Sequence, residues 1–168
     1  SVAERIELCL FDPAGAETDR VDLDGRGHGT WSVVVPGAGH GMGGAYEQND
    51  DATVFTFTLD SESVFSDGTP ITADDVVFSF ERARSDTSQL RAYANASGMP
   101  KKIDDLTVEF TTNGPNPVEL EHIVTINIMS KAWCEKNRAT KPQNYTQKED
   151  MVTARQANGT GPYMLKAR

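Results

Sequence analysis

The sequence lacks any long apolar run and has few aromatic side chains. Its 168 residues are 8% aromatic, while 14 glycines and 8 prolines punctuate the chain. No stretch approaches the roughly 20 apolar residues that a membrane-spanning helix requires, which argues against membrane insertion. Residues Ser1–Glu7 also lack the basic start and apolar run of a signal peptide. A chain expressed as given is therefore expected to stay in the cytoplasm.

Basic residues are also scarce. Lysine and arginine number 16 against 25 aspartates and glutamates, which gives a formal net charge of -9. Nucleic acids and anionic membranes bind to basic surfaces, so this balance disfavours both as partners. The length leaves room for one domain with a hydrophobic core and is too short for two substantial ones.

Cysteine is limited to Cys9 and Cys134, which lie far apart and form no CxxC pair. Cys9 falls in an apolar, strand-like run, which favours a buried free thiol over a metal ligand. A disulfide between the two stays open as an alternative, although nothing in their spacing argues for one.

The middle of the chain carries the clearest secondary-structure signals. Thr53–Leu59 alternates strictly between apolar and polar residues and predicts a strand. Ser66–Pro70 predicts a tight turn in which Gly68 supplies positive φ. Thr72 is expected to cap a helix over Ala73–Arg84, with an acid three residues on as in a capping box. The apolar face of that helix is formed by Val76, Val77, Phe80 and Ala83.

Shorter signals predict the remaining elements. A run of glycines predicts a loop at Gly37–Gly44, because glycine is costly to order. Strands are expected at Arg5–Phe11, Trp31–Val35, Leu106–Thr112 and Tyr163–Leu165, with period-two alternation also at Ile123–Met129. Helices are expected at Ser88–Ala96, where Ser97–Pro100 ends the helix, and at Val118–His122, Ser130–Asn137 and Lys148–Ala157.

Four sequence blocks follow one another between Tyr46 and Arg168. They read D-D-A-T-V-F-T-F-T-L, F-S-D-G-T-P-I-T-A-D-D-V-V-F-S-F-E-R-A, I-D-D-L-T-V-E-F-T-T and A-N-G-T-G-P-Y-M-L-K. Together they resemble family 5 of the bacterial extracellular solute-binding proteins, which supply dipeptides and oligopeptides to ABC importers. The resemblance implies a segment of the first lobe, a periplasmic or extracellular parent, and an ABC importer as its partner. Most ligand-gripping positions of the family lie in later sequence, so no binding residue is carried over.

The N-terminal part resembles a different family. The stretches E-R-I-E-L-C-L-F-D-P-A-G-A-E-T and W-S-V-V-V-P-G-A-G-H-G are similar to the β-sandwich module that opens glycogen-debranching and isoamylase-type enzymes. The two resemblances meet near residue 45. We therefore expect two segments, 1–45 and 46–168, joined as a fusion of two gene fragments. The alternative is that residues 1–46 are a divergent start of the solute-binding protein.

The residues that could carry chemistry form no closed constellation. His28 and His40 flank one strand and could meet an acid such as Asp22 or Asp24, but a metal site needs three or four ligands in one shell. His122 is the only histidine near Cys134, and a thiol nucleophile needs a base within hydrogen-bond reach. Gly39–Gly43 lacks the Lys-Ser/Thr of a phosphate loop, and Asp74-Asp75 suits a helix start. The sequence thus assigns no catalytic or ligand-binding residue and predicts no metal or cofactor.

These observations predict an α+β fold in which a mixed or antiparallel sheet is packed by helices. The N-terminal strands would extend this sheet or pair with a second copy. The expected function is that of a truncated, chimeric fragment of a peptide-type solute-binding protein with little affinity of its own. The alternatives are a small hydrolase with a site at the junction or dimer interface, and a weak peptide- or glycan-binding module that uses Trp31 or Trp133. Uncovered strand edges and apolar surface predict a homodimer or higher oligomer.

Overall fold

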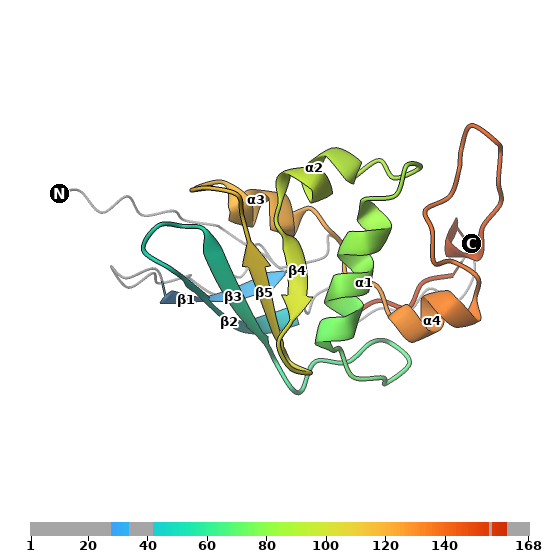
Figure 1. Cartoon of the computed structure of the whole chain (residues 1–168). Coiled ribbons are helices and arrows are strands. Elements are labelled where there is room, and N and C mark those ends of the chain that lie inside the picture. The colour runs from blue at the N-terminus through green and yellow to red at the C-terminus, as the bar shows by residue number, and fades with distance from the viewer. Residues whose placement is uncertain (1–27, 34–41, 155, 161–168) are drawn as a thin grey trace, which may run out of the picture.

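The computed structural model describes residues 28–33, 42–154 and 156–160, which form one antiparallel sheet with helices packed against it (Figure 1). The strand order in the sheet is β1-β2-β3-β5-β4. The strands are β1 (His28–Val33), β2 (Met42–Gln48), β3 (Val54–Leu59), β4 (Met99–Lys102) and β5 (Thr107–Thr111). The helices are α1 (Ala73–Ala83), α2 (Arg91–Ala96), α3 (Glu119–Val124), α4 (Lys131–Lys136) and a 3-10 turn at Val152–Ala154.

The central strands β3 and β5 provide one face of the core. Phe55, Phe57 and Leu59 are buried while the residues between them are half-buried or exposed, as the alternation in the sequence predicts. Strand β5 pairs antiparallel with β3, so that Phe57 lies opposite Val108 and Phe55 opposite Phe110. The two buried rows therefore form one continuous apolar surface on the sheet.

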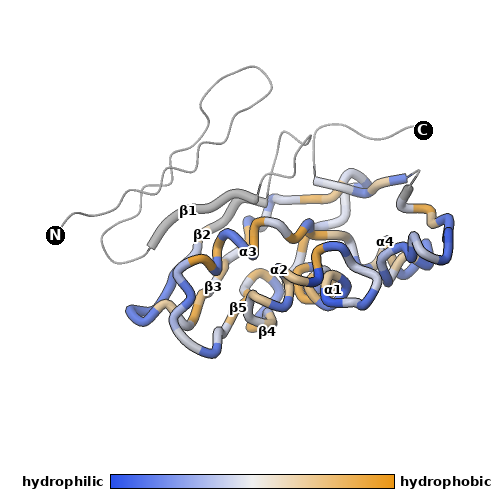
Figure 2. Tube along the Cα trace, turned by 90° about the horizontal axis from the view of Figure 1, so that it is seen from above, coloured by the Kyte–Doolittle hydropathy of each residue, from blue (hydrophilic) through white to orange (hydrophobic). Residues whose placement is uncertain are grey.

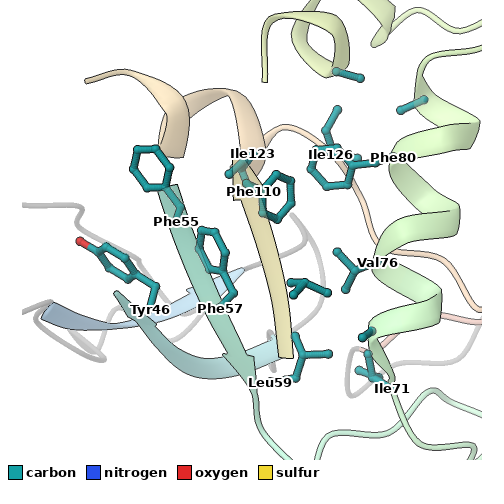
Figure 3. Packing of buried hydrophobic residues seen from close by; sticks show 14 of the residues in the cluster. Tyr46, Phe55, Phe57, Leu59, Ile71, Val76, Phe80, Phe110, Ile123 and Ile126 are labelled. Carbon is teal, nitrogen blue, oxygen red and sulfur yellow. The ribbon is translucent and has the colours of Figure 1, made fainter. Parts of the chain in front are cut away.

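A chain of aromatic contacts joins this sheet to α1 (Figure 3). The ring of Tyr46 on β2 stacks on Phe57, with centroids 5.9 Å apart, and Phe57 meets Phe110 edge-on at 5.4 Å. Phe110 in turn packs against Phe80 on α1 at 4.9 Å, again edge-on. Edge-to-face geometry is the favourable arrangement for aromatic rings. The chain of rings thus connects strands β2, β3 and β5 to the buried face of α1.

The first strands and helix α4 lie at different ends of the described part. Both views place β1 and β2 at one end and α4 at the other, with α1 between α4 and the sheet (Figures 1 and 2). Among the described residues, no helix has the length and apolarity needed to cross a membrane. The sheet is antiparallel throughout, which settles the alternative between mixed and antiparallel pairing, and β1 and β2 extend it.

Helix α1 begins where the sequence predicts. Thr72 is its N-cap, and the Asp75 carboxylate accepts hydrogen bonds at 3.0 Å from both the backbone amide and the hydroxyl of Thr72. Gly68 has the predicted positive φ, at 81°. Helices α2, α3 and α4 fall within or beside the predicted ranges. The strand prediction at Leu106–Thr112 is confirmed as Thr107–Thr111.

Three predictions of local structure are wrong. The loop expected at Gly37–Gly44 gives way to strand β2 from Met42 onward, because pairing with β1 and β3 fixes the backbone of Gly43 and Gly44. The end of the second predicted helix is confirmed, since Ser97 is the C-cap of α2. The chain then enters β4, an edge strand in which Pro100, lacking an N–H, is tolerated. The helix expected at Lys148–Ala157 is reduced to a 3-10 turn at Val152–Ala154, since Lys148 has a φ of 54°, outside the helical region. The strand-like alternation at Ile123–Met129 forms no strand, because its first two residues belong to helix α3.

The strands expected at Arg5–Phe11 and Tyr163–Leu165 lie outside the described residues.

Candidate functional site

The first polar cluster lies where the start of α1 meets the chain before α4. Asp75 is 7% exposed, and its Oδ1 accepts a hydrogen bond of 2.8 Å from the backbone amide of Lys131. One helical turn later, the Ser79 hydroxyl donates to the carbonyl of Asp75 at 2.6 Å and accepts from the amide of Met129 at 2.8 Å. Ser130 then caps α4 by accepting from the amide of Trp133. These contacts fix residues 129–131 against α1.

The second cluster joins two of the family-like sequence blocks. The Asp67 carboxylate accepts a hydrogen bond from the Asn158 side-chain amide at 2.9 Å, and the Asp67 amide donates to Asn158 Oδ1 at 3.2 Å. The backbone amide and the hydroxyl of Ser66 both donate to the carbonyl of Gly159 at 2.7 Å. Hydrogen bonds from Thr69, through its hydroxyl first and its amide second, lower the pKa of Asp67. The D-G-T-P turn and the N-G-T segment thus hold each other in place.

The third cluster surrounds a carboxylate with no exposed surface. Glu119 on α3 is 0% exposed, and its Oε1 accepts from the amide of Gly98 at 2.9 Å while Oε2 accepts from the side-chain amide of Asn116 at 2.7 Å. Burial raises the pKa of Glu119, and the two hydrogen bonds oppose that shift. Arg84 lies nearby and donates to the carbonyls of Ala94 and Ser97. The cluster ties α3 to the segment between α2 and β4.

The candidate residues of the described part do not form a catalytic pair. His122 lies on α3 and its ring contacts Tyr93 on α2 at 6.4 Å between centroids, whereas Cys134 is buried on α4. Both views show α3 and α4 apart, so the histidine does not serve the thiol as a base (Figures 1 and 2). Burial raises the pKa of the Cys134 thiol, with the Arg82 charge acting against it. In the described part, His122 and Cys134 therefore do not form a base–nucleophile pair.

The remaining candidates have varied places. Asp74 is exposed and forms an ion pair of 2.6 Å with Lys102, while its neighbour Asp75 caps the helix, so the two aspartates serve the helix start as predicted. Trp133 is half-buried on α4. Among the described residues no group of three metal-binding side chains occurs. Outside the described side chains lie His28 and Trp31, whose backbones belong to β1, and outside the described residues altogether lie Cys9, Asp22, Asp24 and His40.

Sequence reasoning misses Ser79, Glu119 and Asn158 as structural polar groups. Ser79 and Glu119 lie on the buried faces of helices, beside Phe80 and Ile123 respectively. A polar residue on an apolar helical face was the available signal, because such a group must find a hydrogen-bond partner when buried. Its partner, however, comes from a distant segment and has no local signature.

The fold and its clusters define a class of protein: an α+β segment of the kind that forms a lobe of a periplasmic binding protein. The ABC transporter substrate binding protein CtaP of Listeria monocytogenes has this fold, with a TM-score of 0.59 and 26% identity over 80% of this chain and 26% of that one. This chain belongs to the bacterial extracellular solute-binding proteins, family 5 Middle, whose model matches residues 40–168. The family resemblance read from the four sequence blocks is confirmed.

Two curated relatives carry names that concern peptides. The probable peptide-binding protein YejA of Agrobacterium fabrum is 33% identical over 119 residues, which cover 70% of this chain and 19% of that protein. The periplasmic oligopeptide-binding protein OppA of Escherichia coli is 32% identical over 148 residues, covering 70% of this chain and 27% of OppA. The chain thus spans about a fifth to a quarter of the length of these relatives.

Proposed function

We propose that this chain is a segment of the solute-binding component of a bacterial ABC importer, that its solute class is peptides, and that it acts in the periplasm. The family match and the names of YejA and OppA support this assignment. An ABC importer is then the partner of the whole protein. The observation that carries the structural role is the contact between Asp67 and Asn158, which joins two family-like blocks 91 residues apart.

The chain would act as a scaffold and have little affinity for peptides by itself. The polar groups of all three clusters already form hydrogen bonds within the fold; Asp75 and Glu119 are buried, whereas Asp67 is exposed. A small-molecule site encloses most of its ligand and needs polar groups that converge on it. Polar groups that are satisfied internally leave little to offer a peptide in the described part.

The test is isothermal titration of the purified chain with a mixture of tripeptides and pentapeptides, and separately with a linear maltooligosaccharide. We expect no heat of binding for either ligand at concentrations up to about 1 mM. A dissociation constant of about 1 mM corresponds to a binding free energy of about -4 kcal/mol, so any affinity should be weaker than that. Micromolar peptide binding would contradict the scaffold role but keep the family assignment. Binding of the saccharide alone would favour a glycan-binding module instead.

A positive test is the transfer of this segment into a relative. Residues 46–168 would replace the aligned segment of E. coli OppA, and the hybrid would be compared with OppA for oligopeptide affinity and for cooperative unfolding. Retained affinity in a folded hybrid would support the role proposed here. A folded hybrid that no longer binds oligopeptides would argue that the segment serves a different solute class.

We further propose that the part of segment 1–45 that precedes the family match, residues 1–39, has a separate origin, in a β-sandwich module like those of glycogen-debranching enzymes. The family match begins at residue 40 and leaves the preceding residues unmatched, which supports a change of origin near that point. Removal of residues 1–27 is then expected to leave the Tm of the remaining chain unchanged within a degree or two. A large fall in Tm would indicate that those residues belong to the same folding unit.

A further inference from the structure

Two asparagine–glycine pairs occur in the chain, and the fold holds them differently. They are Asn113-Gly114, in the turn after β5, and Asn158-Gly159, in the segment that contacts the Ser66–Pro70 turn. Asparagine is a thermolabile residue. It deamidates most readily before glycine, which has no side chain to hinder attack of its backbone nitrogen on the asparagine side chain. Each pair is therefore a candidate site of spontaneous chemical modification.

The first pair is held by few contacts. The side chain of Asn113 is exposed and forms no hydrogen bond within the described part of the chain. The carbonyl of Gly114 accepts one hydrogen bond, of 2.7 Å, from the hydroxyl of Thr112. Nothing lies within 4 Å of a Cβ atom placed on Gly114, so the surroundings leave room for movement. We expect this pair to react in the folded protein nearly as it does in the unfolded chain.

The second pair is anchored on both of its residues. Nδ2 of Asn158 donates to Oδ2 of Asp67 at 2.9 Å, and Oδ1 accepts from the backbone amide of Asp67 at 3.2 Å. The carbonyl of Gly159 accepts from both the amide and the hydroxyl of Ser66, each at 2.7 Å. Asn158 is also half-buried, whereas Asn113 is exposed. Both polar atoms of the reactive side chain are thus bound to one partner.

Deamidation has to dismantle this anchor. The backbone nitrogen of Gly159 attacks Cγ of Asn158, and as the new N–Cγ bond forms the Cγ–Nδ2 bond breaks. Ammonia leaves with the proton from the attacking nitrogen. Water then opens the cyclic imide at either carbonyl, adding its hydroxyl to the carbon and its hydrogen to the nitrogen, which leaves aspartate or isoaspartate. Because Nδ2 departs, the hydrogen bond that it donates to Asp67 opposes the reaction.

We propose that Asn158 is a latent deamidation site: its contacts with Asp67 and Ser66 suppress the reaction while this joint is closed, and the reaction makes an opening of the joint permanent. The product has a carboxylate oxygen where Nδ2 donated before. Hydrogen bonds from Thr69 lower the pKa of Asp67, so that its carboxylate is ionised at neutral pH. Two like charges then face each other in place of a donor and an acceptor.

The first test follows deamidation of the wild-type chain by mass spectrometry of its peptides, in the folded state and in denaturant, at the same mildly alkaline pH. In the folded chain Asn158 should react at least about tenfold more slowly than Asn113, since only molecules with an open joint react. In denaturant the two rates should converge, because glycine follows both asparagines. Equal rates in the folded chain, or the same ratio in denaturant, would overturn the proposal.

The second test removes the partner of Nδ2. Asp67→Ala should raise the rate at Asn158 toward that at Asn113, which is measured in the same sample. Thr69→Val is the matched control, because it removes a hydroxyl bonded to Asp67 and spares the bonds between Asp67 and Asn158; its effect should be much smaller. An unchanged or slower reaction in Asp67→Ala would contradict the protective contact. Should that variant not fold, the wild-type comparison of folded and denatured chains decides alone.

The third test examines the product. Asn158→Asp reproduces the aspartate form and should speed hydrogen exchange at the amide of Ser66, which donates to Gly159 in the closed joint. Asn113→Asp adds the same charge at an exposed position and should leave that exchange unchanged. Exchange at Ser66 that is the same in Asn158→Asp as in the wild type would show that the joint survives deamidation, and the proposal would be wrong.

Discussion

Gly98 occupies a point at which two backbone segments approach too closely for any side chain. A Cβ atom placed there would lie 2.5 Å from the carbonyl oxygen of Thr111 and 3.0 Å from its carbonyl carbon. The amide of the same residue donates to the buried carboxylate of Glu119. The missing side chain thus allows β4 to pair with β5 while the chain also contacts α3.

Replacement of Gly98 by alanine is therefore expected to destabilise the protein by about 2 kcal/mol, because backbone atoms must move to relieve the overlap. Denaturant unfolding followed by circular dichroism measures the change. Gly114→Ala is the matched control, since nothing lies within 4 Å of a Cβ atom there, and its effect should stay within about 0.5 kcal/mol. Equal effects of the two substitutions would show that the contact with Thr111 does not matter.

Cys134 is a free, buried thiol whose pKa is raised by burial, so its reactive thiolate is rare and shielded. In a Cys9→Ser variant, which leaves Cys134 as the single thiol, we expect no reaction with Ellman's reagent while the protein is folded. One equivalent should react after denaturation. Rapid reaction of the folded variant would indicate an exposed thiol and would reopen a chemical role for this residue.

At the scale of elements, Asp75 joins the start of helix α1 to the start of helix α4. Its carboxylate accepts from the amide of Thr72 at the start of α1 and from the amide of Lys131 at the start of α4. Removal of the side chain leaves two backbone amides without their acceptor in a place that water reaches poorly. Such groups are costly to leave unpaired, more so than the same groups at an exposed helix end.

Asp75→Ala should lower the free energy of unfolding by about 2 kcal/mol and speed hydrogen exchange at the amide of Lys131. Asp74→Ala removes the neighbouring acid, which is exposed and contacts Lys102, and should have a much smaller effect. Mass spectrometry of exchange in peptides that span α4 provides the measurement. Unchanged exchange at the start of α4 in Asp75→Ala would contradict the link between the helices.

How far an element can be predicted depends on whether its cause is local. The alternation of Phe55, Phe57 and Leu59 belongs to a single strand, and the cap at Thr72 needs only three further residues, so both are visible in the sequence. The bond from Lys131 to Asp75 spans 56 residues and has no local signal. Strand β4 escapes prediction for the same reason: its four residues, including a proline, become a strand by pairing with β5.

The candidate site shows the same limit more sharply. The sequence points to His122 as a polar residue on a short helix, but its burial against Tyr93 depends on how α2 and α3 meet. Glu119 resembles any surface glutamate in sequence, and it is buried because Asn116 and Gly98 supply donors from two sides. Partners contributed by separate segments decide which polar residues become structural or titratable groups.

At the scale of the whole molecule, the sheet ends on each side in a strand with a single described partner. Strand β4 pairs with β5 and β1 pairs with β2. An edge strand offers unpaired backbone groups to another chain, and proline and lysine are residues that discourage such pairing. Strand β4 contains Pro100, Lys101 and Lys102, so it is the protected edge. Exposed apolar residues on the helices, such as Val118 and Val124 at the two ends of α3, offer a second surface for association.

We therefore expect the purified chain to form a homodimer or a higher oligomer. Light scattering after gel filtration should give a mass of at least twice the 18.3 kDa of one chain, rising with protein concentration. The double variant Val118→Glu/Val124→Glu separates the two routes of association: it should restore a monomer if the exposed valines at the ends of α3 form the interface, and leave the oligomer intact if strand edges pair. If the wild-type chain stays monomeric across the concentration range, neither the strand edges nor the exposed apolar residues drive association. The expectation of self-association would then be wrong.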